Sequence, residues 1–310
     1  MPLPYAAGAP DFKAAGFIPT IFSSQVNVKY YFETLLPRIT NTKYSADLKQ
    51  KGDTVIIPQR PTITWKDSKV AEESDPTIPS SAPVEFDLQR LLTFDFVIPD
   101  VLDKQSGLNV GQESTTDATM SMDGEIQSRF FADVYKYADP ANQGATAGKQ
   151  SQYYNMGTAA SPIAVNSASA LKFITSFRSI LAEQKAARDG MWIVIPEVLR
   201  YKLMNSALYK AMDMGDAKSI LRTGLIGSID QCQIFSTPQL YTQTVGGNMV
   251  FAVIGGNMDA ITYFAQMNKA ETLRYHKYMG DRYRGTVIYD WKVIKPEALV
   301  AAFIYISADS

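Results

Sequence analysis

The sequence has almost none of the residues that build disulfides, zinc sites or histidine-based catalysis. Its 310 residues include one cysteine, Cys232, and one histidine, His276. A single cysteine excludes an internal disulfide, and a single histidine excludes a metal site with two histidine ligands. A Ser-His-Asp triad would need His276, yet no G-x-S-x-G motif supplies a matching serine. We therefore expect packing or surface roles for both residues, with no catalytic site and no metal site.

The sequence also lacks an excess of charge and a long hydrophobic run. It has 30 basic and 31 acidic residues, for a formal net charge of -1. A dedicated nucleic-acid reader is disfavoured because it would need many cations to neutralise phosphates, whereas near-neutral copies pack together without strong repulsion. No apolar run approaches the roughly 20 residues that cross a bilayer, and the N-terminal residues do not form a secretory signal. We expect cytoplasmic synthesis and no membrane partner.

One glycine-rich segment, GATAGKQS from Gly144 to Ser151, is weakly similar to the loop that binds nucleotide phosphates. That motif requires four residues between its glycines and a serine or threonine directly after its lysine. Here three residues separate the glycines, and Gln150 follows Lys149. The segment is therefore predicted to be a flexible loop, and no cofactor is expected.

The first forty residues are typical of an extended arm. Prolines and glycines recur through them and prevent a stable regular element. An apolar and aromatic stretch, VNVKYYFETLL from Val26 to Leu36, is compatible with either a strand or a helix that stops before Pro37. The arm either docks on its own core or reaches a neighbouring subunit.

Two β-type runs follow, KGDTVIIPQRPTITW and VEFDLQRLLTFDFVI, and a long charged and Pro/Ser-rich segment separates them. Their pattern predicts an extended hairpin with a polar tip. Phe86, Leu88 and Arg90 are expected on one face of the second run, which Phe94 and Phe96 continue. Because an isolated two-stranded hairpin is marginally stable in water, this hairpin needs an external surface to lie on.

The strongest helical pattern runs from Asp117 to Tyr137. The apolar residues Met122, Ile126, Phe130 and Val134 recur at four-residue steps and predict one buried stripe. Asp139-Pro140 supplies a stop. At 1.5 Å per residue, the helix would be about 30 Å long, which is enough to brace a domain.

The rest of the chain is predicted to be of mixed α and β character. A helix from Ala170 to Arg188, the strand MWIVIP, a helix after Pro196 and the strand CQIF follow one another, and the later segments alternate as sheet strands. In the last of these segments Val287, Tyr289, Trp291 and Val293 share a face suited to packing under the long helix. The expected class is α+β with a mixed sheet.

Two C-terminal segments are similar to those of a known family. ILRTGLIGSIDQCQIFSTPQL, residues 220–240, has two glycine turns before a strand, and AITYFAQMNKAETLRYHKYMGDRYRGTVIYDWKVIKPEALVAAF, residues 260–303, ends on a Lys-Pro-Glu-Ala-Leu step. In order and spacing these motifs resemble the major capsid proteins of tailed double-stranded DNA bacteriophages. The motifs cover about the last ninety residues. Gln231 departs from a common glycine, and Asp290-Trp291 replace a common Gly-Ala pair before the last strand.

The resemblance implies the Hong Kong 97-like capsid fold, in the α+β class. It implies an N-terminal arm (1–45), an extended hairpin or E-loop (46–104), a peripheral domain (105–160 and 250–310) with a spine helix at about 117–138, and an axial domain (161–249). The implied function is self-assembly, through hexamers and pentamers, into an icosahedral shell. Scaffolding and portal proteins are the implied partners, and the enclosed double-stranded DNA is met by non-specific proximity. The implied location is the virion capsid, assembled in the host cytoplasm.

Contacts between subunits are expected along the hairpin. We expect apolar anchors and charge-pairing residues there: Trp65, Phe86 and Phe94 as anchors, and Arg60, Lys66, Glu72 and Glu73 as partners in charge pairs. Another phage structural subunit, such as a tube or decoration protein, is one alternative, although the long helix argues against it. A cytosolic α/β enzyme is the other.

Overall fold

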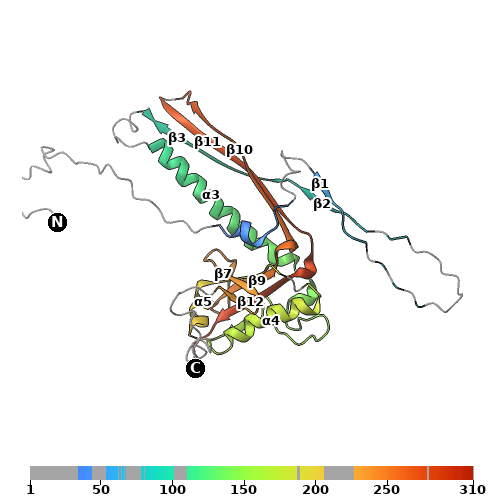
Figure 1. Ribbon diagram of the computed structural model, residues 1–310. Coiled ribbons are helices and arrows are strands. Elements are labelled where there is room, and N and C mark those ends of the chain that lie inside the picture. The colour runs from blue at the N-terminus through green and yellow to red at the C-terminus, as the bar shows by residue number, and fades with distance from the viewer. Residues whose placement is uncertain are drawn as a thin grey trace, which may run out of the picture.

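A computed structural model describes eleven stretches of the chain: residues 34–43, 54–61, 63, 65, 67, 78–79, 81–100, 110–186, 189–205, 227–277 and 279–309. Side chains are described for all of these except Val110, Gln112 and residues 267–270. The described part has a long body of helix and sheet, a lobe at one end of that body, and a hairpin that leaves it (Figure 1).

The long body consists of α3 (Val110–Val134) beside a three-stranded antiparallel sheet of order β10-β11-β3 (Figure 1). Its strands are β3 (Arg90–Pro99), β10 (Ile261–Arg274) and β11 (Gly280–Val293). The predicted stripe of Met122, Ile126, Phe130 and Val134 is confirmed, because all four side chains are buried in the largest core cluster.

The long helix begins at Val110, seven residues before the predicted start at Asp117. Two threonines near the predicted start lie inside the helix: the Thr115 hydroxyl donates to Gly111 O at 2.8 Å, and the Thr119 hydroxyl to Thr115 O at 2.9 Å. Such bonds to the preceding turn satisfy the hydroxyls without ending the helix. A single 3-10 turn, Tyr135–Tyr137, follows Val134.

The lobe contains a seven-stranded mixed sheet of order β4-β12-β9-β5-β7-β6, with β8 paired to β9. The pairs β4/β12 and β5/β7 are parallel, and the others are antiparallel. Its strands are β4 (Ile163–Val165), β5 (Met191–Ile195), β6 (Ser228–Ile229), β7 (Cys232–Ser236), β8 (Thr242–Val245), β9 (Asn248–Asn257) and β12 (Leu299–Ile306). The expected mixed sheet is confirmed.

Helices α4 (Ala170–Glu183) and α5 (Glu197–Met204) belong to the lobe. Phe177 of α4 is fully buried and packs on the backbone of β9 at Gly255, where a Cβ atom would lie 2.7 Å from the ring. The helix was predicted to reach Arg188 but ends at Glu183, because Lys185 adopts a left-handed φ of 59°. The Ala186 N–H then donates back to Leu181 O, which is a typical helix-ending bond.

The most N-terminal described segment, residues 34–43, packs onto the core of its own chain. The short helix α1 (Leu36–Ile39) contains Pro37 in its first turn, where proline is well tolerated. Leu36 and Ile39 are buried, and the Asn41 N–H donates to Ile261 O of β10. Most of the stretch from Val26 to Leu36 lies outside the described residues.

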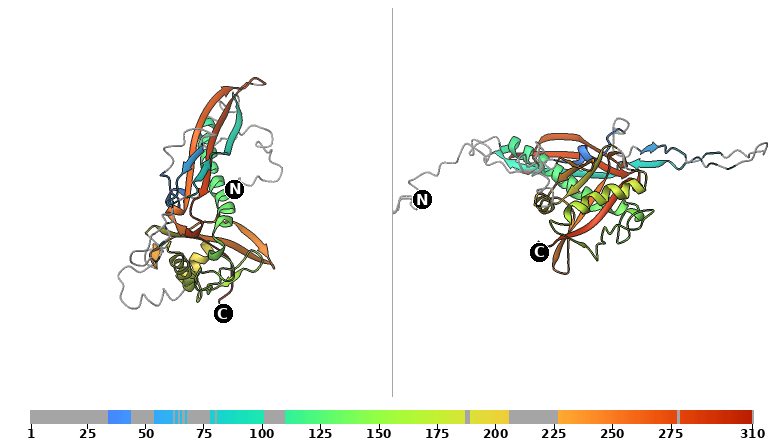
Figure 2. Two further views of the ribbon diagram at one scale, coloured as in Figure 1. Left: turned by 90° about the vertical axis from the view of Figure 1, so that its right-hand side faces the viewer. Right: turned by 60° about the horizontal axis from the view of Figure 1, so that its bottom comes forward.

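The hairpin consists of β1 (Thr54–Ile57) and β2 (Val84–Asp87), which pair antiparallel. It projects away from the body, as Figure 1 and the right-hand view of Figure 2 show. The second predicted run is divided: Leu88 and Gln89 separate β2 from β3, which pairs with β11 in the other sheet. The prediction of one continuous face from Phe86 to Phe96 is therefore wrong.

Candidate assembly surface

The hairpin exposes large apolar side chains. The exposed fractions are 60% for Ile56, 67% for Ile63, 94% for Trp65 and 88% for Ile78. Several large apolar side chains exposed on one projecting element are typical of a protein contact. We call the set formed by Ile56, Ile63, Trp65 and Ile78 the hairpin strip. Its chemistry fits an apolar protein partner.

The base of the hairpin is attached to the body by a separate apolar cluster. Ile57, Phe86 and Leu88 pack there with Phe264, Ile288 and Ile294 of the body. Phe86 is 1% exposed. The prediction that Phe86 anchors a neighbouring subunit is therefore wrong for this conformation, because its ring packs against the body of its own chain.

The other residues predicted for subunit contacts fall into three groups. Trp65 is 94% exposed on the hairpin, and Arg60 is exposed as well. Phe94 is half-buried on its own sheet, where its ring covers Gly285 and stacks with Phe96 at 6.0 Å between centroids. The remaining three, Lys66, Glu72 and Glu73, lie outside the described residues.

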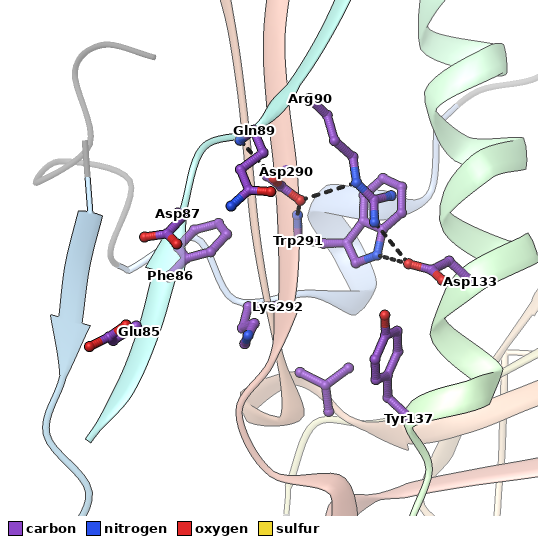
Figure 3. A pocket seen from close by; sticks show the side chains of 11 residues that line it. Glu85, Phe86, Asp87, Gln89, Arg90, Asp133, Tyr137, Asp290, Trp291 and Lys292 are labelled. Carbon is purple, nitrogen blue, oxygen red and sulfur yellow. Dashed lines mark hydrogen bonds and ion pairs between the residues drawn. The ribbon is translucent and has the colours of Figure 1, made fainter. Parts of the chain in front are cut away.

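A polar cavity of about 350 Å³ lies at the root of the hairpin, between β2, β11 and the end of α3 (Figure 3). Asp290 of β11 is at its centre and is 7% exposed. Its Oδ2 accepts from the Gln89 N–H at 3.0 Å, and its Oδ1 accepts from the Trp291 N–H at 2.8 Å. The carboxylate thus holds the backbone of the segment that joins β2 to β3.

Arg90 fills the other side of this root (Figure 3). Its guanidinium bonds Asp133 of α3 at 2.9 Å and lies 3.4 Å from Asp290. It also stacks over the Trp291 ring, 3.7 Å from the centroid, and the indole N–H donates to Asp133 at 3.1 Å. Lys136 adds a second cation 3.5 Å from Asp133. Planar stacking with two-sided ion pairing is suited to arginine and not to lysine.

Sequence reasoning did not predict the contacts at this root. One signal was visible, because Asp290-Trp291 is a pair at which the chain departs from the family that it resembles. Neither residue was predicted to meet Arg90 and Asp133. These partners come from different elements, and only the fold brings the end of α3 next to the start of β3.

The single cysteine, Cys232, is buried in the core of the lobe. Burial raises the pKa of the Cys232 thiol to about 11, which disfavours the nucleophilic thiolate. Among residues 34–309, in the stretches described, no cluster of three or more metal-binding side chains occurs. No helix in those stretches has the length and apolar character to span a bilayer.

Two backbone amides of the glycine-rich loop at residues 144–151 are hydrogen-bonded to Glu183. The Gln150 and Ser151 N–H groups donate to Glu183 Oε2 at 2.9 and 3.1 Å, and the Ser151 hydroxyl donates to Oε1 at 2.6 Å. These bonds, with the hydroxyl contributing most, hold the pKa of the Glu183 carboxyl below its usual range. A phosphate would compete with this carboxylate for the same donors, so the loop is not arranged as a nucleotide site.

The long helix against a three-stranded sheet, the mixed-sheet lobe and the projecting hairpin define an α+β class of fold. No protein-family model matches the chain, and no curated protein matches its sequence. Solved structures do match over nearly the whole chain. A chain from Mycobacterium phage Che8 is 20% identical with a TM-score of 0.72, and the match covers 92% of this chain and 97% of that one.

Two further matches come from solved phage capsids. The cyanophage P-SCSP1u capsid gives 13% identity and a TM-score of 0.68, covering 98% of this chain and 97% of that one. The Ralstonia phage GP4 capsid gives 10% identity and a TM-score of 0.62, covering 100% of both chains. The chain therefore has the fold of phage capsid chains, and the fold expected from the resemblance is confirmed.

Proposed function

We propose that this chain is the major capsid protein of a tailed double-stranded DNA bacteriophage and that it self-assembles into the icosahedral shell. The observation that carries the proposal is the full-length likeness to chains of phage capsids, with TM-scores up to 0.68. The projecting hairpin with its exposed apolar strip supports it independently, because such a strip needs a partner surface.

The proposed mechanism is assembly through many modest contacts. The hairpin strip lies across a neighbouring copy, where Trp65 supplies the largest apolar anchor. Exposed charge pairs, such as one formed by Arg60, add about 0–1 kcal/mol each. Weak individual contacts let misplaced subunits dissociate before the shell closes.

The proposed division of the chain into segments follows the Hong Kong 97-like fold. The segments are an arm (1–45), an E-loop (46–104), a peripheral domain with the spine helix α3 (105–160 and 250–310) and an axial domain (161–249). Hexamers and pentamers of this chain form the shell, and scaffolding and portal proteins are the proposed partners during assembly in the host cytoplasm. The enclosed DNA meets the inner surface without sequence-specific contacts.

The proposal is tested by size-exclusion chromatography combined with negative-stain electron microscopy of the purified chain. We expect rings of subunits and closed shells, alone or with a co-expressed scaffolding protein. Long tubes would favour the tube-protein alternative. A monomer that forms no assembly, with a melting temperature that rises when a small ligand binds, would favour an enzyme and overturn the proposal.

A further inference from the structure

The sheet ladder between β3 and β11 ends at one identifiable residue pair. The last paired residues are Arg90 and Tyr289. The next N–H along the chain, that of Gln89, donates to the side chain of Asp290 at 3.0 Å. A carboxylate therefore takes the place of a main-chain acceptor at the point where the chain leaves the sheet and enters the hairpin (Figure 3).

Arg90 fixes this exit point relative to the rest of the body. It pairs with Asp290 on β11 and with Asp133 on α3, and its guanidinium plane rests on the Trp291 ring. Asp290 and Trp291 are both buried. The Arg90 side chain is 36% exposed, and its carboxylate partners are more buried. Hydrogen bonds are directional, and partly buried ion pairs are screened less than fully exposed ones, so these contacts define an orientation.

The second attachment of the hairpin is apolar. Ile57 and Phe86 pack with Phe264 and Ile288 at the base of the hairpin. Apolar burial holds surfaces together but is non-directional. The apolar cluster therefore attaches the hairpin to the body, and the contacts of Arg90 and Asp290 fix the angle between the two.

We propose that Arg90 and Asp290 are positioning residues, which fix the angle between the hairpin β1–β2 and the body and so present the hairpin strip to a second copy in one orientation. The assembly role rests on the proposed function, whereas the fixed angle does not. A shell closes only when every copy offers the same geometry. A pre-oriented hairpin also loses less conformational freedom on docking, which favours binding.

The angle can be measured in the unassembled subunit with two spin labels. Ile56 on β1 and Met120 on α3 are both exposed and can be replaced by cysteine. The native Cys232 does not compete for the label, because it is buried and its pKa is raised to about 11. Pulsed electron paramagnetic resonance on Ile56→Cys/Met120→Cys then reports the distribution of distances between hairpin and helix.

Four further substitutions in that background test the proposal. Arg90→Met and Asp290→Ala remove the directional contacts, and we expect distance distributions at least twice as wide as in the parent. Asp290→Asn keeps an acceptor for the Gln89 N–H and should stay closer to the parent. Arg282→Met is the matched control, because it removes an Arg–Asp pair with Asp95 elsewhere on the same sheet and should leave the distribution unchanged. If Arg90→Met fails to fold, Arg90→Lys keeps the charge without the planar stack and takes its place.

Unchanged distributions in Arg90→Met and Asp290→Ala would overturn the proposal. Particle size by electron microscopy gives the second readout, measured on the same substitutions in the chain with native Ile56 and Met120, because Ile56 belongs to the hairpin strip. Arg90→Met and Asp290→Ala should form shells of irregular diameter, while Arg282→Met forms uniform ones. Broad distance distributions with uniform shells would overturn the assembly role alone. If the parent chain forms no shells at all, the proposed function fails, and the distance data still decide whether Arg90 and Asp290 fix the angle.

Discussion

The lobe and the hairpin are built from similar β-forming residues, yet they bury them very differently. In the lobe every residue of β5 is buried, as are the first six residues of β12. In the hairpin, one residue of β1 and one of β2 are buried. The lobe strands lie inside a seven-stranded sheet, whereas the hairpin strands have only each other. The difference indicates that the lobe stabilises itself and that the hairpin is shaped for a surface outside the subunit.

The largest effect on stability is therefore expected in the lobe. Phe177→Ala removes a fully buried ring that packs on β9 and Phe173. Loss of its burial and the cavity left behind should lower the free energy of unfolding by about 3–5 kcal/mol. Urea denaturation followed by circular dichroism measures the change. A loss below about 1 kcal/mol would show that the lobe core is not tightly packed around Phe177, which would contradict a lobe that stabilises itself.

An intermediate effect is expected where the N-terminal segment, α3 and the lobe meet. Gln127 is fully buried, and its Oε1 accepts from the Leu35 N–H at 2.7 Å. Its Nε2 donates to Gln239 Oε1 at 2.6 Å and lies 3.3 Å from Thr237 Oγ1. Gln127→Leu strands these groups without partners, which should reduce the free energy of unfolding by about 1–3 kcal/mol.

Hydrogen exchange locates the effect of Gln127→Leu. The Leu35 amide should exchange faster in the variant, because its acceptor is gone. Gln243→Leu is the matched control, since that side chain makes an exposed bond to Ala159 O and its loss should change stability by no more than about 0.5 kcal/mol. Equal effects of the two substitutions would contradict the role given to Gln127.

A small, pH-dependent effect is expected at the end of the lobe. Asp309 accepts from Lys202 Nζ at 2.7 Å and from the Ser167 N–H at 2.9 Å, and these contacts, Lys202 first, lower the pKa of its carboxyl to about 2. A lowered pKa means that the ionised form stabilises the fold. That contribution is complete above about pH 4 and disappears as the pH falls through about 2.

Asp309→Asn removes this contribution and so provides the test. Its melting temperature should lie slightly below that of the parent at pH 6, and the difference should shrink as the pH falls to about 2. Comparing the two proteins at each pH cancels the titration of the other carboxyl groups. A difference that stays constant from pH 6 to pH 2 would show that the Asp309 charge is not the cause.

Local patterns predicted the interior of the molecule well. The four-residue repeat from Met122 to Val134 located the buried face of α3, and MWIVIP located β5. The start of α3 was wrong because a Ser/Thr run serves equally as a cap or as helix interior, and only its surroundings decide. The resemblance of the C-terminal motifs supplied the fold, which no periodicity alone could give.

The root of the hairpin was harder to predict, for a physical reason. VEFDLQRLLTFDFVI has an unbroken β pattern, yet it divides at Leu88 and Gln89, where the Gln89 N–H donates to Asp290, 201 residues away in sequence. Phe86 was expected at a subunit contact for the same reason. An apolar surface does cover Phe86, as expected, but that surface belongs to its own chain.

In the proposed mechanism, the hairpin strip serves assembly and contributes nothing to the stability of the subunit. Ile63→Ser/Trp65→Ser tests it most directly, with Trp65→Phe as the control that keeps an apolar ring. Sedimentation velocity and electron microscopy measure assembly, and thermal unfolding measures the subunit. We expect the double variant to keep the melting temperature of the parent but to form no shells. We expect Trp65→Phe to form shells. Normal shells from Ile63→Ser/Trp65→Ser would contradict it.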